Sequence, residues 1–368
     1  MQQKLGTNNL IRGATFFQHA GVSIVYVFMP ILAQSLTTNI FEVGVTIASF
    51  FLAQILSSLY FGRISDASGK RLLFIKIGFI GCALTFGLHY LADNSFYLLL
   101  ARLGAGVTSG MMVPTMLAYT YESGKDKSKV ASLISFHALG WLAGIVAAGI
   151  ANNEKTIFLI SAALFLAGLA VCLRLPSNAT AKETGRGLTK QVISKNRYLF
   201  LSLLLRHIGA TSVWTILPLI LTQALGAKLY QVSMVYVANT ATAFILMNLM
   251  DTKITTKNIT KFKLGVGLTV FVFIGMALMT SWWMAIPCMA LVGVTWAFLY
   301  IGGSIHLMEN NPKSTSTGIF NSTISIANVI GPVVAGTIAF YSQTAVMYFA
   351  VGICIAAFLV SLKIKQGS

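Results

Sequence analysis

Twelve runs of mostly apolar residues, separated by short polar loops, make up nearly the whole of this chain. A helix needs roughly 17–25 such residues to cross the hydrocarbon core of a bilayer, and each run is long enough to do so. Charged residues amount to only 10% of the sequence, far below the share of about 25% in soluble domains. The sequence therefore predicts an all-α polytopic membrane protein surrounded by a lipid bilayer.

The twelve runs fall into two groups of six. We expect helices at residues 9–34, 40–61, 72–91, 96–119, 130–150, 156–175, 198–223, 229–250, 263–281, 283–307, 317–340 and 344–362. The longest polar stretch lies between the sixth and the seventh run and carries five cations. This pattern predicts an N-terminal six-helix bundle (1–175), a basic central loop (176–197) and a C-terminal six-helix bundle (198–368).

The formal net charge of +17 does not indicate nucleic-acid binding, because the cations lie in the gaps between apolar runs and not on one helix or tail. If the N-terminus is cytoplasmic, inside segments hold 22 cations and outside loops hold two, Lys155 and Lys228. The positive-inside rule then predicts that both termini and the central loop are cytoplasmic and that the protein lies in the cell membrane. The four cysteines have no metal-like spacing, so we expect no metal or cofactor.

The first and seventh runs repeat one another at an interval of 188 residues. The matched pairs are His19 with His207, Gly21 with Gly209, Val25 with Val213, Tyr26 with Trp214 and Pro30 with Pro218. Five matches within twelve positions predict that the two halves are duplicated six-helix units. Transporters built from parallel repeats bind their substrate between the repeats, near the middle of the membrane.

A polar motif separates the second run from the third. Its residues are Gly62, Asp66, Gly69, Lys70 and Arg71. Together with the 6+6 layout and the basic central loop, this motif resembles the signature of the major facilitator superfamily (MFS) of secondary transporters. Only Ala67 departs from the pattern, because a basic residue commonly follows the aspartate. The resemblance implies a twelve-helix, pseudo-symmetric transporter that works by alternating access.

The same resemblance suggests a role for the motif. In this family the motif is thought to latch the two halves together in the outward-open state, and Glu122 resembles the acidic partner of its basic residues. Gly62 would let its helix approach a neighbour closely. The alternative is a basic loop that only directs membrane insertion, with Asp66 solvated.

Arg102 lies inside the fourth run, where a charge is a functional-site hypothesis by default. It is followed by small residues, as in the family's helix 4 signature, which suggests a role in conformational coupling. It could instead tether neighbouring carbonyls or snorkel to the outer surface. Gly140 and Gly144 in the fifth run resemble the antiporter signature of drug exporters, although Ile145 replaces the expected proline; helix packing is the alternative.

Candidate substrate or proton residues lie near the middle of the first and seventh runs. They are Gln18, His19 and Tyr26, and Arg206, His207 and Trp214. The two histidines lie about ten residues into their runs, which is about 15 Å at 1.5 Å per residue. Arg206 could bind a carboxylate or phosphate, a histidine could carry a coupling proton, and the aromatic side chains could stack on a planar substrate. Alternatively, the histidines bond across helix interfaces, Arg206 faces cytoplasmic water and the aromatics only pack.

Two substrate hypotheses follow for a secondary transporter. We favour a small organic anion or metabolite carried with a proton, because of Arg206 and because none of the nine carboxylates lies centrally in a run. A multidrug-type antiporter of lipophilic compounds is favoured by the loop motif and the glycine-rich runs. The sequence has no Gly-x4-Gly-Lys-Ser/Thr loop for ATP and no enzyme-like cluster. We therefore expect a transporter that is coupled to a proton, is not an enzyme and acts as a monomer.

Overall fold

The computed structural model describes residues 2–124, 127–153, 155–176, 189–253, 256–311 and 313–364. Within these ranges the chain is helical and contains no strand. Among the described residues, ten helical segments are long and apolar enough to cross a membrane, and two shorter apolar helices cover Phe136–Ala151 and Thr156–Cys172. These twelve segments match the predicted runs to within a few residues, and they confirm the predicted all-α membrane fold.

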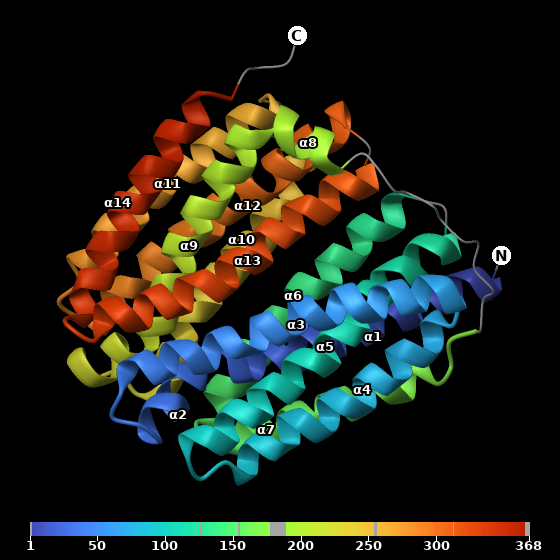
Figure 1. Cartoon of the computed structure of the whole chain (residues 1–368), viewed down its shortest axis with the longest axis horizontal. Coiled ribbons are helices and arrows are strands. Elements are labelled where there is room, and N and C mark those ends of the chain that lie inside the picture. The colour runs from blue at the N-terminus through green and yellow to red at the C-terminus, as the bar shows by residue number, and fades with distance from the viewer. Residues whose placement is uncertain are drawn as a thin grey trace. The chain divides into compact units, whose positions relative to one another are not determined.

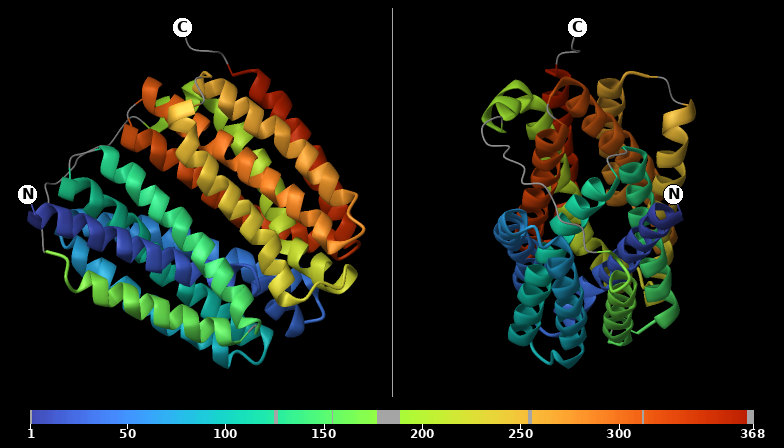
Figure 2. Two further views of the ribbon diagram at one scale, coloured as in Figure 1. Left: turned by 180° about the vertical axis from the view of Figure 1, so that it is seen from behind. Right: turned by 90° about the vertical axis from the view of Figure 1, so that its right-hand side faces the viewer.

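The chain divides into two compact units, of which unit 1 comprises residues 1–38 and 49–184. Its helices are α1 (Gln2–Tyr26), α2 (Met29–Ser35), most of α3 (Ile40–Ser68), α4 (Arg71–Leu88), η1 (His89–Leu91), α5 (Ser95–Gly124), α6 (Lys127–Ala151) and α7 (Thr156–Cys172). In this unit α1 packs against α6 and α7, and α4 packs against α5 and α7 (Figures 1 and 2).

Unit 2 comprises residues 39–48 and 185–368. Its helices are the start of α3, then α8 (Thr189–Lys195), α9 (Arg197–Leu219), η2 (Ile220–Ala224), α10 (Leu229–Lys253), α11 (Asn258–Ala277), η3 (Trp282–Met284), α12 (Ala285–Asn310), α13 (Lys313–Ala339) and α14 (Gln343–Leu362). Here α9 packs against α13 and α14, and α11 packs against α12 and α14. Helices α9, α13 and α14 thus have the same neighbours in unit 2 as α1, α6 and α7 have in unit 1.

Individual contacts recur between the two units as well. Gly21 of α1 lies against the ring of Phe165 in α7, and Gly209 of α9 lies against Ile353 in α14. Both members of the second contact stand 188 residues after their counterparts. The interval that links the matched sequences therefore also links the packing inside each unit, as a duplicated bundle requires.

A proline interrupts the first membrane segment. The sequence predicts one helix over 9–34, but α1 ends at Tyr26 and Pro30 lies in the first turn of α2. Proline has no N–H group and its ring clashes with the carbonyl four residues earlier, which here belongs to Tyr26. The matched Pro218 lies inside α9 just before the π-helical turn η2, so the two repeats accommodate the same proline differently.

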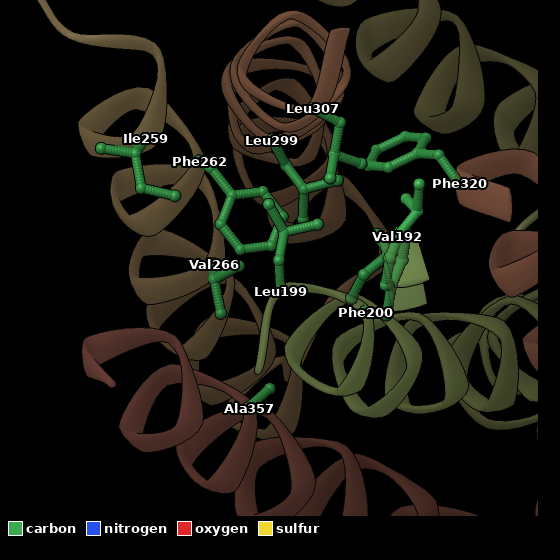
Figure 3. Close-up of a cluster of buried hydrophobic side chains, with 11 residues drawn as sticks. Val192, Leu199, Phe200, Ile259, Phe262, Val266, Leu299, Leu307, Phe320 and Ala357 are labelled. Atoms are coloured by element: carbon green, nitrogen blue, oxygen red, sulfur yellow. The ribbon is translucent and has the colours of Figure 1, made fainter. Parts of the chain in front are cut away.

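Helix α8 forms within the stretch that the sequence predicts as a loop, of which residues 177–188 lie outside the described residues. Val192 of α8 is buried in an apolar cluster with Leu199, Phe200 and Phe320 (Figure 3). Burial of a valine side chain contributes about 1.5–3 kcal/mol, which helps to hold such a short helix in place. The sequence does not predict this helix because α8 is mostly polar, and Val192 is one of only two large apolar side chains in it.

Candidate functional site

Two glycines of α6 let it approach α1 very closely. A Cβ atom on Gly140 would collide with the carbonyl oxygen of Phe16, and one on Gly144 would collide with that of Ala20. The hydroxyl of Ser23 donates to the carbonyl of Gly140 across the same interface, at 3.4 Å. The glycine pattern of the fifth run thus packs two helices together, as small residues do in membranes.

This close approach brings His137 of α6 onto His19 of α1. Their ring centroids lie 3.5 Å apart and their planes differ by 10°, so the two imidazoles are stacked. His137 is exposed and His19 is half-buried. Sequence reasoning selected His19 but missed His137, because only the tertiary contact at Gly140 relates the two positions.

Trp141 completes this cluster, one helical turn after His137. Its indole Nε1–H donates to Nδ1 of His19 at 3.2 Å. The indole cannot accept a hydrogen bond, so neutral His19 carries its own proton on Nε2. Tyr26 meets Trp141 edge to face, with the ring centroids 5.3 Å apart. Gln18 is buried on the same helix, and none of the described contacts joins it to this cluster.

The second unit places different partners around His207. Its ring lies 5.5 Å from that of Trp296 in α12, and its side chain bonds with Asn328 of α13. Nδ1 of His207 has no hydrogen-bond partner among the described residues. The matched histidines therefore both contact the fifth membrane helix of their half, which is α6 for His19 and α13 for His207. The partner of His19 is an indole N–H, whereas the partner of His207 is an amide.

Arg206 is buried within unit 2, with 2% of its surface exposed. Its Nε donates to Oγ1 of Thr269 at 3.1 Å, and its Nη2 donates to Oγ1 of Thr295 at 3.3 Å. The guanidinium carbon also lies 5.9 Å from the ring centroid of Trp296. The alternative in which Arg206 faces cytoplasmic water does not fit this burial. A guanidinium has five N–H donors, and these two bonds leave three for other acceptors.

Arg102 is buried in unit 1, with 4% of its surface exposed, so its side chain does not snorkel to the surface. The guanidinium carbon lies 4.4 Å from the ring centroid of Phe50, which is the geometry of a cation–π contact. Its Nε has no hydrogen-bond partner among the residues the structure describes. Arg102 interacts electrostatically with Tyr26, which also contacts Trp141 of the histidine and tryptophan cluster.

Trp214 lies apart from His207. It packs edge to face against Tyr236 of α10 and Phe273 of α11, with centroid separations of 6.4 and 6.0 Å. These contacts fit the packing alternative for this tryptophan. Tyr26 and Trp214, although matched in sequence, thus make different contacts in the two units.

The loop motif marks the junction of α3 and α4. Gly69 has a φ of 68°, and its N–H donates to the carbonyl of Ser65 at 3.0 Å, which ends α3 in the manner of a glycine cap. Arg71 is buried, and its Nη1 donates to the hydroxyl of Ser65 at 3.2 Å. Lys70 is exposed. The side chains of Asp66 and Glu122 lie outside the described residues, so the latch and its acidic partner stay predictions.

The close helix contact that we expected at Gly62 does not occur within the described part of the chain. Among the described residues, no atom lies within 4 Å of the place where Gly62 would carry a Cβ. The close approach to α3 occurs instead at Gly106 and Gly110 of α5, where a Cβ would collide with the carbonyls of Phe50 and Gln54. Hydroxyl groups of α3 donate to α5 carbonyls beside these glycines, which explains why the contact forms there.

Comparisons with known proteins agree with this architecture. The family model described as Major Facilitator Superfamily matches residues 13–317. The multidrug resistance protein MdtG of Proteus mirabilis (strain HI4320) is 24% identical over 362 residues, which cover 91% of this chain and 89% of that protein. The quinolone resistance protein NorA of Staphylococcus aureus is 28% identical over 99 residues, which cover 27% of this chain and 25% of that protein.

Solved structures show the same fold at low sequence identity. The nucleoside transporter NupG superposes with a TM-score of 0.80 at 13% identity, over 99% of this chain and 100% of that one. A bacterial homologue of the human lysosomal transporter Spinster, in an inward-facing and occupied conformation, superposes with a TM-score of 0.76 at 13% identity. That alignment covers 98% of this chain and 96% of the homologue.

Proposed function

The chain belongs to the major facilitator superfamily, and from this premise we propose that it is a proton-coupled secondary transporter that exports lipophilic compounds by alternating access. Of the two substrate hypotheses, this is the multidrug-type antiporter. Its support from similarity is the alignment with MdtG, a multidrug resistance protein, along 91% of the chain.

The observation that carries the proposal is the cluster on α1 and α6. His19, His137, Trp141 and Tyr26 form a group of aromatic rings in which both imidazoles can be neutral. Aromatic faces bind apolar and planar ligands without demanding one arrangement of charges, which suits a transporter with many substrates. A titratable imidazole beside such a surface offers a place for a coupling proton.

A second candidate function is supported by Arg206. The guanidinium is buried, bonds to two threonine hydroxyls, and has no carboxylate within ion-pair distance in the described part of the chain. Its remaining N–H donors could hold the carboxylate or phosphate of a small organic anion. We place this candidate second, because hydroxyls of α11 and α12 already hold the side chain.

The membrane topology is part of the same proposal. The excess of 22 cations over two favours a cell-membrane protein with cytoplasmic termini, and with the stretch 176–197 on the cytoplasmic side between two six-helix bundles. We further propose that one chain suffices for transport, because both halves of a duplicated transporter are present in it.

Transport by the purified chain in proteoliposomes tests this function. Ethidium serves as the lipophilic cation and benzoate as the organic anion, each measured with and without an imposed proton gradient. We expect gradient-driven movement of ethidium, lost when an ionophore collapses the gradient. Movement of benzoate alone, abolished by Arg206→Ala, would replace the first candidate with the second. Failure of the gradient to drive either compound would contradict proton coupling.

A further inference from the structure

We infer that His19 and His137 together form a one-proton site, in which His137 carries the proton and Trp141 keeps His19 neutral. This inference deepens the proposed function and rests on it for the meaning of the proton, although the site can be tested without any transport. Neither the family motif nor the sequence repeat contains His137, so neither of them predicts this site.

The stacking of the rings limits the pair to one proton. With centroids 3.5 Å apart, two imidazolium rings would place like charges in contact. One imidazolium on one neutral ring is favourable, because the face of a neutral aromatic ring attracts a cation. A second proton is therefore strongly disfavoured while the stack is intact.

The hydrogen bond from Trp141 decides which ring takes the proton. Nδ1 of His19 already accepts from the indole N–H, and its Nε2 carries the hydrogen of the neutral ring. Adding a proton at Nδ1 would set two N–H groups against each other and break that bond. His137 is exposed and receives no such bond among the described residues, so it can bind a proton without losing one.

The helices around α1 bring few other charges to the stack. Among residues 136–151 of α6, His137 is the one titratable side chain. On α7 the one titratable side chain is that of Cys172, which lies near Lys76. On α5, Arg102 interacts with Tyr26, and on α1 itself the guanidinium of Arg12 lies 5.8 Å from the ring of Phe136. In the described part of unit 1, the proton on the pair therefore has no carboxylate to neutralise it.

The described part of the second unit lacks this arrangement. Gly144 and Gly331 make equivalent contacts, with Ser23 and with Thr211, which stand at matched places in α1 and α9. Counted from these two glycines, the residue in α13 that corresponds to His137 is Ile324. The repeat therefore keeps one histidine in each unit but builds a pair of imidazoles only in the first.

The chain has five histidines, so each can be followed by NMR. The full-length protein would be labelled with [13C]histidine, placed in lipid nanodiscs and titrated from pH 5 to pH 8, with each resonance assigned by a His→Gln variant. We expect the His137 resonance to titrate while His19 stays in the neutral Nε2–H form. In Trp141→Phe, His19 should begin to titrate as well, and Trp296→Phe serves as the matched control that leaves this pair unchanged. Independent titration of both rings in the unaltered protein, or of His19 alone, would overturn the inference.

Transport then separates the site from its function. In the ethidium assay, His137→Gln should remove the response to the proton gradient, whereas His306→Gln should keep it. Thermal unfolding of both variants would show whether they are folded. If His137 titrates as expected but the gradient has no effect on transport, the one-proton site stands and the proposed coupling fails. If His137 does not titrate, the inference fails whatever the transport result.

Discussion

The indole Nε1–H of Trp141 lies 3.2 Å from Nδ1 of His19, in a contact between α6 and α1 that the glycine at position 140 makes possible. The backbone approach, the hydrogen bond and the stacked imidazoles form one unit of structure. A substitution of Gly140 should therefore alter the contacts between the rings, even though glycine has no functional side chain.

The first prediction concerns Gly140. A methyl group in Gly140→Ala would collide with the carbonyl of Phe16, so α6 must shift away from α1. We expect a loss of about 1–3 kcal/mol in the free energy of unfolding, as in other overpacked interiors, and a change in Trp141 fluorescence. Gly352→Ala is the control, because a Cβ there meets open space. Equal stability of the two variants would show that the interface yields without cost.

The second prediction concerns the two threonines that hold Arg206. Thr269→Val and Thr295→Val each remove one acceptor from the guanidinium. Interhelical hydrogen bonds in membranes average about 0.6 kcal/mol, so each variant should lose about that much stability in thermal or denaturant unfolding. Benzoate transport is the more informative measurement. If the guanidinium of Arg206 binds the anion, benzoate transport should persist in both variants, because the guanidinium itself is unchanged. Loss of benzoate transport without loss of stability would mean that the hydroxyls themselves belong to the substrate site.

The spans could be predicted closely from sequence, whereas the contacts within the candidate site could not. A bilayer requires each crossing segment to satisfy its own backbone hydrogen bonds, so runs of apolar residues report helices directly. The contact of His19 with His137 depends on the register of α1 against α6, and the position of Gly140 sets that register. Likewise, nothing in the spacing of Thr269 or Thr295 connects either one to Arg206.

The two glycines of the loop motif also show which roles can be predicted from sequence and which cannot. Gly69 behaves as a helix-terminating glycine does, because its positive φ ends α3. Gly62 was expected to pack against a neighbouring helix, and the described residues leave it without one. A conformational role is local and can be read from a motif, but a packing role depends on a partner elsewhere in the chain.

The third prediction concerns membrane orientation. In a variant without its four native cysteines, single cysteines would replace Lys190 and Lys228, both of which are exposed. An impermeant maleimide added to intact cells should label position 228 and spare position 190, because the cation excess favours the inside for the latter. Labelling at 190 but not at 228 would reverse the proposed topology.

The fourth prediction concerns the loop between α3 and α4. Arg71 is buried and donates to Ser65, whereas the adjacent Lys70 is exposed. A hydrogen bond to a charged group contributes about 1.5–3 kcal/mol, so Ser65→Ala should destabilise the protein by up to that amount, and Lys70→Ala should change its stability little. Denaturant unfolding in detergent would measure both. Similar losses in the two variants would indicate that the loop is held by its overall charge and not by this bond.

The last prediction concerns the proposed latch. If Asp66 holds one conformation of the transport cycle by charge, Asp66→Asn should slow ethidium transport without altering the preference for ethidium over benzoate. The reason is that a conformational equilibrium affects the turnover of every substrate, whereas a binding residue discriminates between them. Arg63→Gln in the same loop is the control, since it removes one exposed charge outside the motif. A change in substrate preference in Asp66→Asn, or an equal slowing in Arg63→Gln, would argue against a specific latch and for a loop whose charge serves only membrane insertion.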